Sequence, residues 1–128
     1  MTTPMPEPEP PTAPTIVCLC GSTQFGEAFR EANLRETLAG RIVVTIGCNM
    51  RTDPEFAGRP ESELALIKTR LDELHKRKID LADEVLVVSD EDGYFGDSTT
   101  GEIRYAVASG KPVRFAHTAA EERWNALA

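Results

Sequence analysis

Short strand-like segments alternate with longer stretches of helical periodicity along most of this chain. The strand-like segments are residues 15–21, 41–48, 84–90 and 111–116. The predicted helices lie between and after them, at residues 22–40, 61–83, 99–110 and 118–128. Strands that are largely apolar throughout are typical of a parallel sheet covered on both faces. The pattern therefore predicts an α/β fold, a three-layer sandwich around a mostly parallel, Rossmann-like sheet of four to five strands.

The two long helices are expected to bury apolar stripes against this sheet. In segment 22–40 the stripe contains Phe25, Phe29 and Ala32 and continues through Leu34 and Leu38. In segment 61–83 it contains Leu64, Ile67, Leu71, Leu74 and Leu81. His75 lies on the second stripe, where a histidine is more often a core residue than a catalyst. The basic run 76–78 is interpreted as a solvated helix end, with a phosphate or partner contact as the alternative.

Composition limits the kinds of function that the chain can have. Its 128 residues fit one domain, residues 15–128, after a proline-rich segment, 1–14, that is predicted to be disordered. A net charge of −7 argues against binding a nucleic acid polymer but does not exclude a small anionic ligand. No apolar run is long enough to span a membrane. Three cysteines and no recognisable signal peptide favour the reducing cytoplasm.

Right-handed crossovers would bring the carboxyl ends of all the strands to one edge of the sheet, where ligands bind in such folds. The segments expected there are Gly21-Ser22, residues 48–51, Asp90 and the loop that leads to Glu102. A turn such as Gly21-Ser22-Thr23 before a helix offers free N–H groups and hydroxyls to an anion, although many helices begin this way as a simple cap.

Glu102 has two interpretations. Thr99 and Glu102 have the T-x-x-E spacing of a capping box, in which each side chain bonds the other residue's backbone N–H. That interpretation does not explain Gly96, Ser98 and Gly101 beside it. A glycine inside a helix costs roughly 1 kcal/mol relative to alanine, which suggests that a ligand approaches the backbone at Gly101. A catalytic role for Glu102 therefore remains open beside the cap.

Metal binding is not expected. The acidic residues Asp90, Glu91, Asp92 and Asp97 lack the spacing of a calcium loop and are interpreted as solvated. Cys18 and Cys20 share one face of a strand, but no CxxC pair or suitable histidine accompanies them, so they are interpreted as core residues.

Three segments together carry a resemblance to a known family. They are the strand that ends in Cys20-Gly21-Ser22, the stretch LADEVLVV at 81–88, and DSTTGEIRYAVASGKPV at 97–113. From about Ile16 to Phe115 the chain resembles the nucleoside 2-deoxyribosyltransferase-like superfamily, which includes 2′-deoxynucleoside 5′-monophosphate N-glycosidases. The resemblance implies that Glu102 is a nucleophile that attacks the anomeric carbon of a nucleotide or nucleoside and displaces the base. It implies no cofactor, and a homo-oligomer in which a neighbour completes the site.

The resemblance also implies roles for other residues. The residues implied to hold phosphate or sugar are Cys20, Gly21, Ser22, Thr23, Ser98, Thr99 and Gly101. Asp97, or alternatively Asp92, would orient the sugar or base. The chain departs from the family at Cys18, which stands where members commonly have a tyrosine, and at His75, which stands where they have an aspartate. Either His75 or Asp80 is expected to assist, and a non-catalytic nucleotide-binding module is the alternative function.

Overall fold

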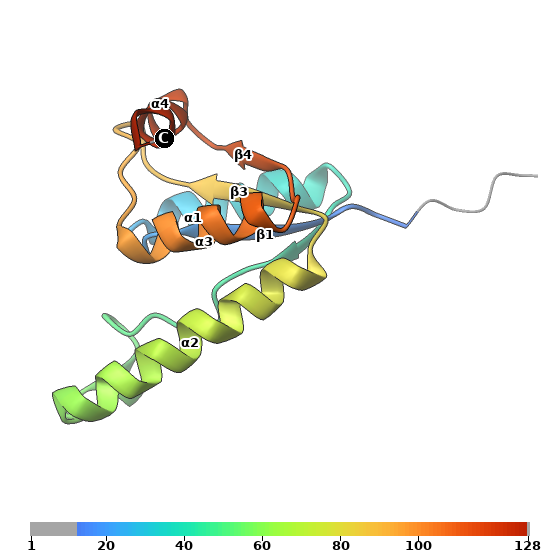
Figure 1. Cartoon of the computed structure of the whole chain (residues 1–128). Coiled ribbons are helices and arrows are strands. Elements are labelled where there is room, and N and C mark those ends of the chain that lie inside the picture. Colours follow the sequence, from blue (N-terminus) through green and yellow to red (C-terminus); the bar gives the residue numbers. More distant parts are fainter. Residues whose placement is uncertain (1–12, 128) are drawn as a thin grey trace, which may run out of the picture.

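The computed structural model describes residues 13–127 of the chain. Within these residues, the chain folds into parallel strands flanked by helices (Figure 1). The strands are β1 (Ile16–Gly21), β2 (Ile42–Val44), β3 (Glu84–Val88) and β4 (Val113–Phe115). The helices are α1 (Gly26–Leu38), α2 (Glu61–Leu81), α3 (Asp97–Ala108) and α4 (Thr118–Leu127), with a short 3₁₀ turn, η1 (Pro54–Phe56). The prediction of a three-layer α/β sandwich is confirmed. The proline-rich tail lies outside the described residues, apart from the exposed residues 13 and 14.

The four strands form one parallel sheet in the order β2-β1-β3-β4. β1 pairs with β2 on one side and with β3 on the other, in a register that places Cys18 beside Val85 and Cys20 beside Val87. The chain therefore runs outward in one direction from β1 to β2, and in the other from β3 to β4. A sheet with this order has a crevice at the carboxyl ends of β1 and β3, where the direction of winding changes.

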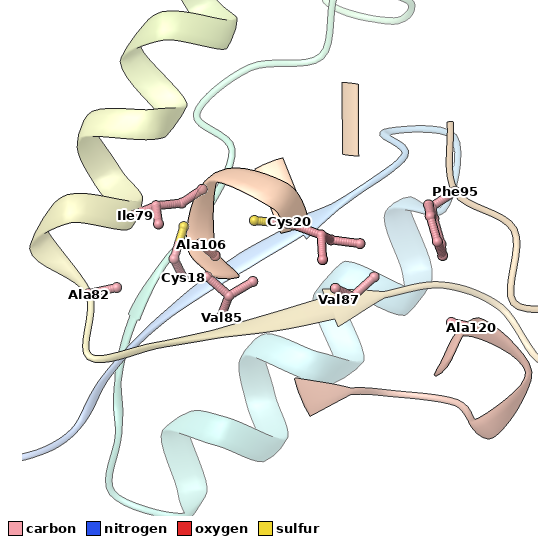
Figure 2. Close-up of a cluster of buried hydrophobic side chains, with 10 residues drawn as sticks. Cys18, Cys20, Ile79, Ala82, Val85, Val87, Phe95, Ala106 and Ala120 are labelled. Atoms are coloured by element: carbon pink, nitrogen blue, oxygen red, sulfur yellow. The ribbon is translucent and has the colours of Figure 1, made fainter. Parts of the chain in front are cut away.

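Each face of the sheet has its own buried core. On one face, Val17, Leu19, Leu86 and Val88 pack with Ala32 of α1. On the other face, the strand residues Cys18, Cys20, Val85 and Val87 pack against helix residues that include Ile79, Ile103, Ala106 and Ala120 (Figure 2). Because side chains alternate along a strand, the two cysteines of β1 both belong to the second core.

Helix α1 is shorter and less buried than predicted. It begins at Gly26 rather than near residue 22, and Leu34 and Leu38 at its end are 53% and 78% exposed. The expected continuation of its apolar stripe is therefore wrong. Only Ala32 and Glu36 of this helix are fully buried, because no further layer covers its outer face.

The stripe predicted for α2 is also only partly buried. Leu64, Ile67 and Leu71 are half-buried, whereas Leu74 and Leu81 are 50% and 71% exposed. The fully buried residues of α2 are His75 and Ile79. The first half of α2 extends away from the sheet (Figure 1), so its apolar side chains have no core beneath them. Among residues 13–127, no helix is both long and apolar enough to cross a membrane.

Candidate functional site

A cavity of about 800 Å³ lies at the carboxyl edge of the sheet. Its walls come from the end of β1 and the turn after it, the loop after β2, one face of α2, and the segment from Tyr94 to Glu102. Three of the segments that the sequence pattern assigns to this edge therefore meet around one space, whereas Asp90 does not line it. The volume is within the range of sites that bind nucleotide-sized ligands, about 300–1,000 Å³.

Glu102 lies in the wall of this cavity and is only 8% exposed. Among the described residues, its Oε2 atom is buried without a hydrogen-bond partner. Burial raises the pKa of Glu102 to about 7, against the opposing effect of a charge on His75. A buried carboxyl with a free oxygen at the edge of a cavity is available to a ligand.

The capping box predicted for Glu102 is wrong. Helix α3 begins at Asp97, with Gly96 as its N-cap residue and no side-chain capping bond. Thr99 and Glu102 therefore both lie inside the helix. The hydroxyl that bonds near the helix start belongs to Thr100, which donates to the carbonyl of Gly96 at 2.9 Å. Glu102 is positioned by the helical turn to face the cavity rather than its own backbone.

His75 of α2 is the residue beside Glu102. Its Nε2 lies 3.8 Å from Glu102 Oε2, and the imidazole is 6% exposed. Burial alone lowers the pKa of His75, but the hydrogen bond to Cys18 and the charge of Glu102 outweigh it, so that the pKa is raised. The packing of α2 thus brings His75 to the predicted nucleophile.

The two cysteines of β1 lie on the other side of this imidazole. His75 Nε2 is 3.3 Å from Cys20 Sγ and 3.6 Å from Cys18 Sγ. A hydrogen bond from the Cys20 thiol and the nearby imidazole lower the pKa of Cys18 to about 5, although burial opposes them. The same hydrogen bond, together with burial, raises the pKa of Cys20. The expectation that no suitable histidine accompanies these cysteines is wrong, because α2 brings His75 to them.

Hydroxyl groups and basic side chains surround the rest of the cavity. Ser22, Thr23, Ser98 and Thr99 all line it. Lys68 Nζ donates to Ser98 Oγ at 2.7 Å and to Asp72 at 3.0 Å. The cavity wall also contains Lys78 and Arg51. An anionic ligand would meet these three cations, although three acids, Asp72, Asp97 and Glu102, line the same cavity.

The role of α2 in this basic wall was not recognised from the sequence, although the signal is present. Leu64, Lys68, Leu71, His75 and Lys78 follow one another at intervals of three and four residues, and all of them line the cavity. Together they form one face of the helix, which carries both apolar and basic side chains and lines the cavity. Within the basic run 76–78, Lys78 lines the cavity and donates to the carbonyl of Thr45 at 3.0 Å. Lys76 and Arg77 lie over the ring of Tyr105.

Other predicted site residues have different positions. Asp97 lines the cavity with an exposed side chain. Cys20 lies behind the wall, in contact with His75. Asp80 is outside the cavity lining, exposed, and bonded to the hydroxyl of Tyr105, because α2 continues as a helix through Leu81.

The structure also bears on two backbone expectations, at Gly101 and at the turn after β1. Gly101 is exposed, and a Cβ atom built there would meet no atom within 4 Å, so no described segment approaches it closely. The Gly21-Ser22-Thr23 turn does not start a helix directly, because Phe25 N first bonds Ser22 O in a separate turn and α1 begins at Gly26.

The fold and the site define an α/β protein with a buried carboxylate in a ligand-sized cavity at the switch point of a parallel sheet. Comparisons of this chain with protein-family models, with characterised proteins and with solved structures find no match. A function for this chain is therefore inferred from the geometry of the cavity and the chemistry of its residues.

Proposed function

We propose that this protein cleaves the N-glycosidic bond of a (deoxy)nucleoside 5′-monophosphate or nucleoside and releases or exchanges the base. The observation that carries the proposal is Glu102, a buried carboxyl whose Oε2 has no hydrogen-bond partner among the described residues and which faces a ligand-sized cavity. A carboxylate in such a place can attack a sugar carbon that develops positive charge.

In the proposed reaction, an oxygen of ionised Glu102 forms a bond to the anomeric carbon as the bond from that carbon to the base nitrogen breaks. The electron pair of the broken bond leaves with the base, which gains a proton from the solvent or from an acid in the cavity. Water then attacks the same carbon, gives up a proton and releases the carboxylate. A second base in place of water would give exchange instead of hydrolysis.

The partners of Glu102 support this role. With its pKa near 7, the side chain is ionised in about half of the molecules at neutral pH, and positive charge that develops on the sugar would favour the ionised form. His75, 3.8 Å away, acts as a positioning residue that stabilises the carboxylate when the imidazole is protonated. Asp97, on the exposed side of the cavity, is in a place to orient a sugar hydroxyl or the base.

The preference for a monophosphate follows from the basic wall of the cavity. Lys68, Lys78 and Arg51 provide positive charge, and Ser98 already accepts a hydrogen bond from Lys68. A phosphate oxygen in place of that hydroxyl would make the acceptor charged as well as the donor, and a hydrogen bond between opposite charges is stronger than one from an ammonium to a neutral hydroxyl.

A non-catalytic nucleotide-binding module of the same fold is the second candidate. One observation favours it: retaining glycosidases place two carboxyl groups about 5–5.5 Å apart, whereas the group that pairs with Glu102 Oε2, at 3.8 Å, is the imidazole of His75. This module would bind nucleotide saturably and form no product.

The test is base release from a panel of ribo- and deoxyribonucleoside monophosphates and the corresponding nucleosides, followed by chromatography. Glu102→Gln is expected to abolish release while retaining ligand binding in a thermal-shift assay. Glu122→Gln, which changes an exposed acid of α4, is the matched control and should behave like wild type. Release that persists in Glu102→Gln would contradict the assigned nucleophile. Binding without release in wild type would support the non-catalytic module.

We further propose a homo-oligomer in the reducing cytoplasm. The exposed leucines of α2 support an oligomer: Leu66, Leu74 and Leu81 are 51%, 50% and 71% exposed, and apolar side chains in such numbers on one helix favour association. Cys18, Cys20 and Cys48 are free thiols, which supports a reducing compartment. Light scattering coupled to size-exclusion chromatography is expected to give a mass of two chains or more, and a monomer at micromolar concentration would contradict it.

A further inference from the structure

Cys18, Cys20 and His75 form a buried cluster of metal-ligand atoms that the proposed reaction does not explain. Their two Sγ atoms and the imidazole nitrogen all lie within 4.8 Å of one another, and all three residues are buried. Both cysteines point from β1 toward the helix layer (Figure 2). Apolar residues at these positions would complete the core without burying polar or ionisable groups, so the cluster calls for a separate explanation.

We propose that this cluster binds one transition-metal ion, Zn²⁺ in particular. A tetrahedral zinc ion, with bonds of about 2.3 Å to sulfur and about 2.0–2.1 Å to nitrogen, holds sulfur and nitrogen about 3.6 Å apart. The two sulfur–nitrogen separations in the structure are 3.3 and 3.6 Å. The three ligand atoms are thus already near the spacing that the metal requires, and only small side-chain shifts are needed.

Charge balance is compatible with a bound metal. Two cysteine thiolates neutralise a divalent ion, and a neutral imidazole adds no charge, so the ion with these three ligands has no net charge to bury. Thiolate and imidazole ligands also select zinc over magnesium and calcium, which prefer oxygen. Each thiol that becomes a ligand releases its proton to the solvent, and binding is therefore stronger at higher pH.

Glu102 lies next to the cluster, on the side of His75. Its Oε2 is 3.8 Å from His75 Nε2, where two ligands of a tetrahedral ion with bonds near 2.0–2.1 Å would be about 3.3 Å apart. This is the same oxygen that has no hydrogen-bond partner among the described residues. Since His75 and Glu102 also line the cavity, an ion has access to the cluster from that side. Glu102 would have to move toward the sulfur atoms to complete the coordination, because it is not among the residues whose ligand atoms lie within 4.8 Å of one another.

The experiment is a titration of the metal-free, reduced protein with Co²⁺, a spectroscopic substitute for zinc. Wild type is expected to bind one equivalent, with thiolate-to-cobalt charge-transfer absorption in the near ultraviolet and intense visible bands typical of tetrahedral geometry. Zn²⁺ should then remove both signals. The double variant Cys18→Ser/Cys20→Ser should lose the charge-transfer absorption. Cys48→Ser is the matched control, because Cys48 lies outside the cluster, and it should keep the full signal.

Several outcomes would overturn the proposal: no charge-transfer absorption in wild type, unchanged absorption in the double variant, or its loss in Cys48→Ser. If circular dichroism shows that the double variant does not fold, the wild-type protein still decides the question. Native mass spectrometry of wild type should then show one Zn²⁺ ion bound per chain, and Cys48→Ser should bind the same amount. Wild type that binds no Zn²⁺ would refute the site.

One consequence rests on the proposed function. A metal-bound cluster would engage or neutralise Glu102, so Zn²⁺ should inhibit base release and a chelator should restore it. The cobalt spectra do not depend on catalysis. A protein that binds cobalt but releases no base would therefore refute the proposed function alone, and one that releases base but shows no cobalt spectrum would refute the metal site alone.

Discussion

Replacement of Glu102 by glutamine should stabilise the metal-free protein at alkaline pH while it abolishes base release. Glutamine has nearly the same shape as glutamate but has no charge to desolvate. The ionised side chain is unfavourable in the folded state because it is 8% exposed and its Oε2 finds no hydrogen bond among the described residues. Enzymes commonly sacrifice stability in this way at a group that must react.

The size and the sign of the effect follow from the pKa of Glu102, which is raised from its ordinary value of 4.5 to about 7. Between these two values the folded protein holds the proton more tightly than the unfolded chain does. The resulting stabilisation is complete below pH 4.5 and is lost as the pH rises through about 7. Each tenfold change in proton affinity is worth about 1.4 kcal/mol. The free energy of unfolding of wild type therefore falls by up to about 3 kcal/mol over this pH range, whereas that of the glutamine variant does not.

The groups that face this carboxyl set the conditions of the measurement. They are His75 and Asp72 from α2 and Cys18 and Cys20 from β1. The protein should be reduced and treated with a chelator, so that the thiols stay free and no metal alters the titration. Urea unfolding followed by circular dichroism, at pH 5 and at pH 8, then gives the free energy of unfolding of each variant.

The glutamine variant should have nearly the same free energy of unfolding as wild type at pH 5 and a higher one at pH 8. Glu122→Gln should match wild type at both values, because this side chain of α4 is exposed. If Glu102→Gln were equally stable at pH 8, or less stable, the conclusion that Glu102 is destabilised by burial would be refuted. A gain of the same size at both pH values would show that packing, not charge, is responsible.

Three further substitutions test other features. Lys68→Gln should lower kcat/KM roughly ten- to hundredfold for a nucleoside monophosphate, because a hydrogen bond between the ammonium and the phosphate is lost. The effect on the nucleoside, which has no phosphate, should be small, and equal losses for both substrates would contradict the phosphate contact. Gly93→Ala should destabilise the fold by at least about 1–3 kcal/mol, which is the cost of a strained residue. Gly93 has a φ of +77°, and an added Cβ would lie 2.4 Å from the backbone of Ala119. An unchanged urea midpoint would refute this. Arg114→Met should lower the free energy of unfolding by about 3 kcal/mol, because it removes an ion pair from Glu36, a carboxylate that is only 4% exposed. A loss below about 1 kcal/mol would show that the other ion pair of Glu36, with Arg41, is sufficient.

The order and type of the elements could be predicted from local patterns. Largely apolar segments at 15–21 and 84–90 contain β1 and β3, and the turns after parallel strands necessarily meet at one edge of the sheet. Glu102 could thus be assigned to the ligand edge. The ends of the helices were less predictable: α3 begins at Asp97 rather than at Thr99, which turns a supposed capping residue into one that faces the cavity.

Burial was harder to infer than periodicity. The pattern of α2 predicts a continuous apolar stripe, but a stripe is buried only where another layer covers it. Leu74 and Leu81 remain exposed because they lie on a different face of α2 from His75 and Ile79, which are the residues that pack against the sheet. The sequence alone indicates which side chains share a helix face, and it does not indicate which face the core covers.

The local sequence thus determines that this chain is a parallel α/β protein with a carboxylate and hydroxyls at its ligand edge. Only the tertiary structure decides what that carboxylate meets. His75 is 57 residues from Cys18 and 55 from Cys20 in sequence, yet the packing of α2 against β1 places its Nε2 within 3.6 Å of both sulfur atoms. Periodicity records a residue's position on its own helix or strand, whereas contacts between elements depend on the crossing of helix and sheet, which no local pattern encodes.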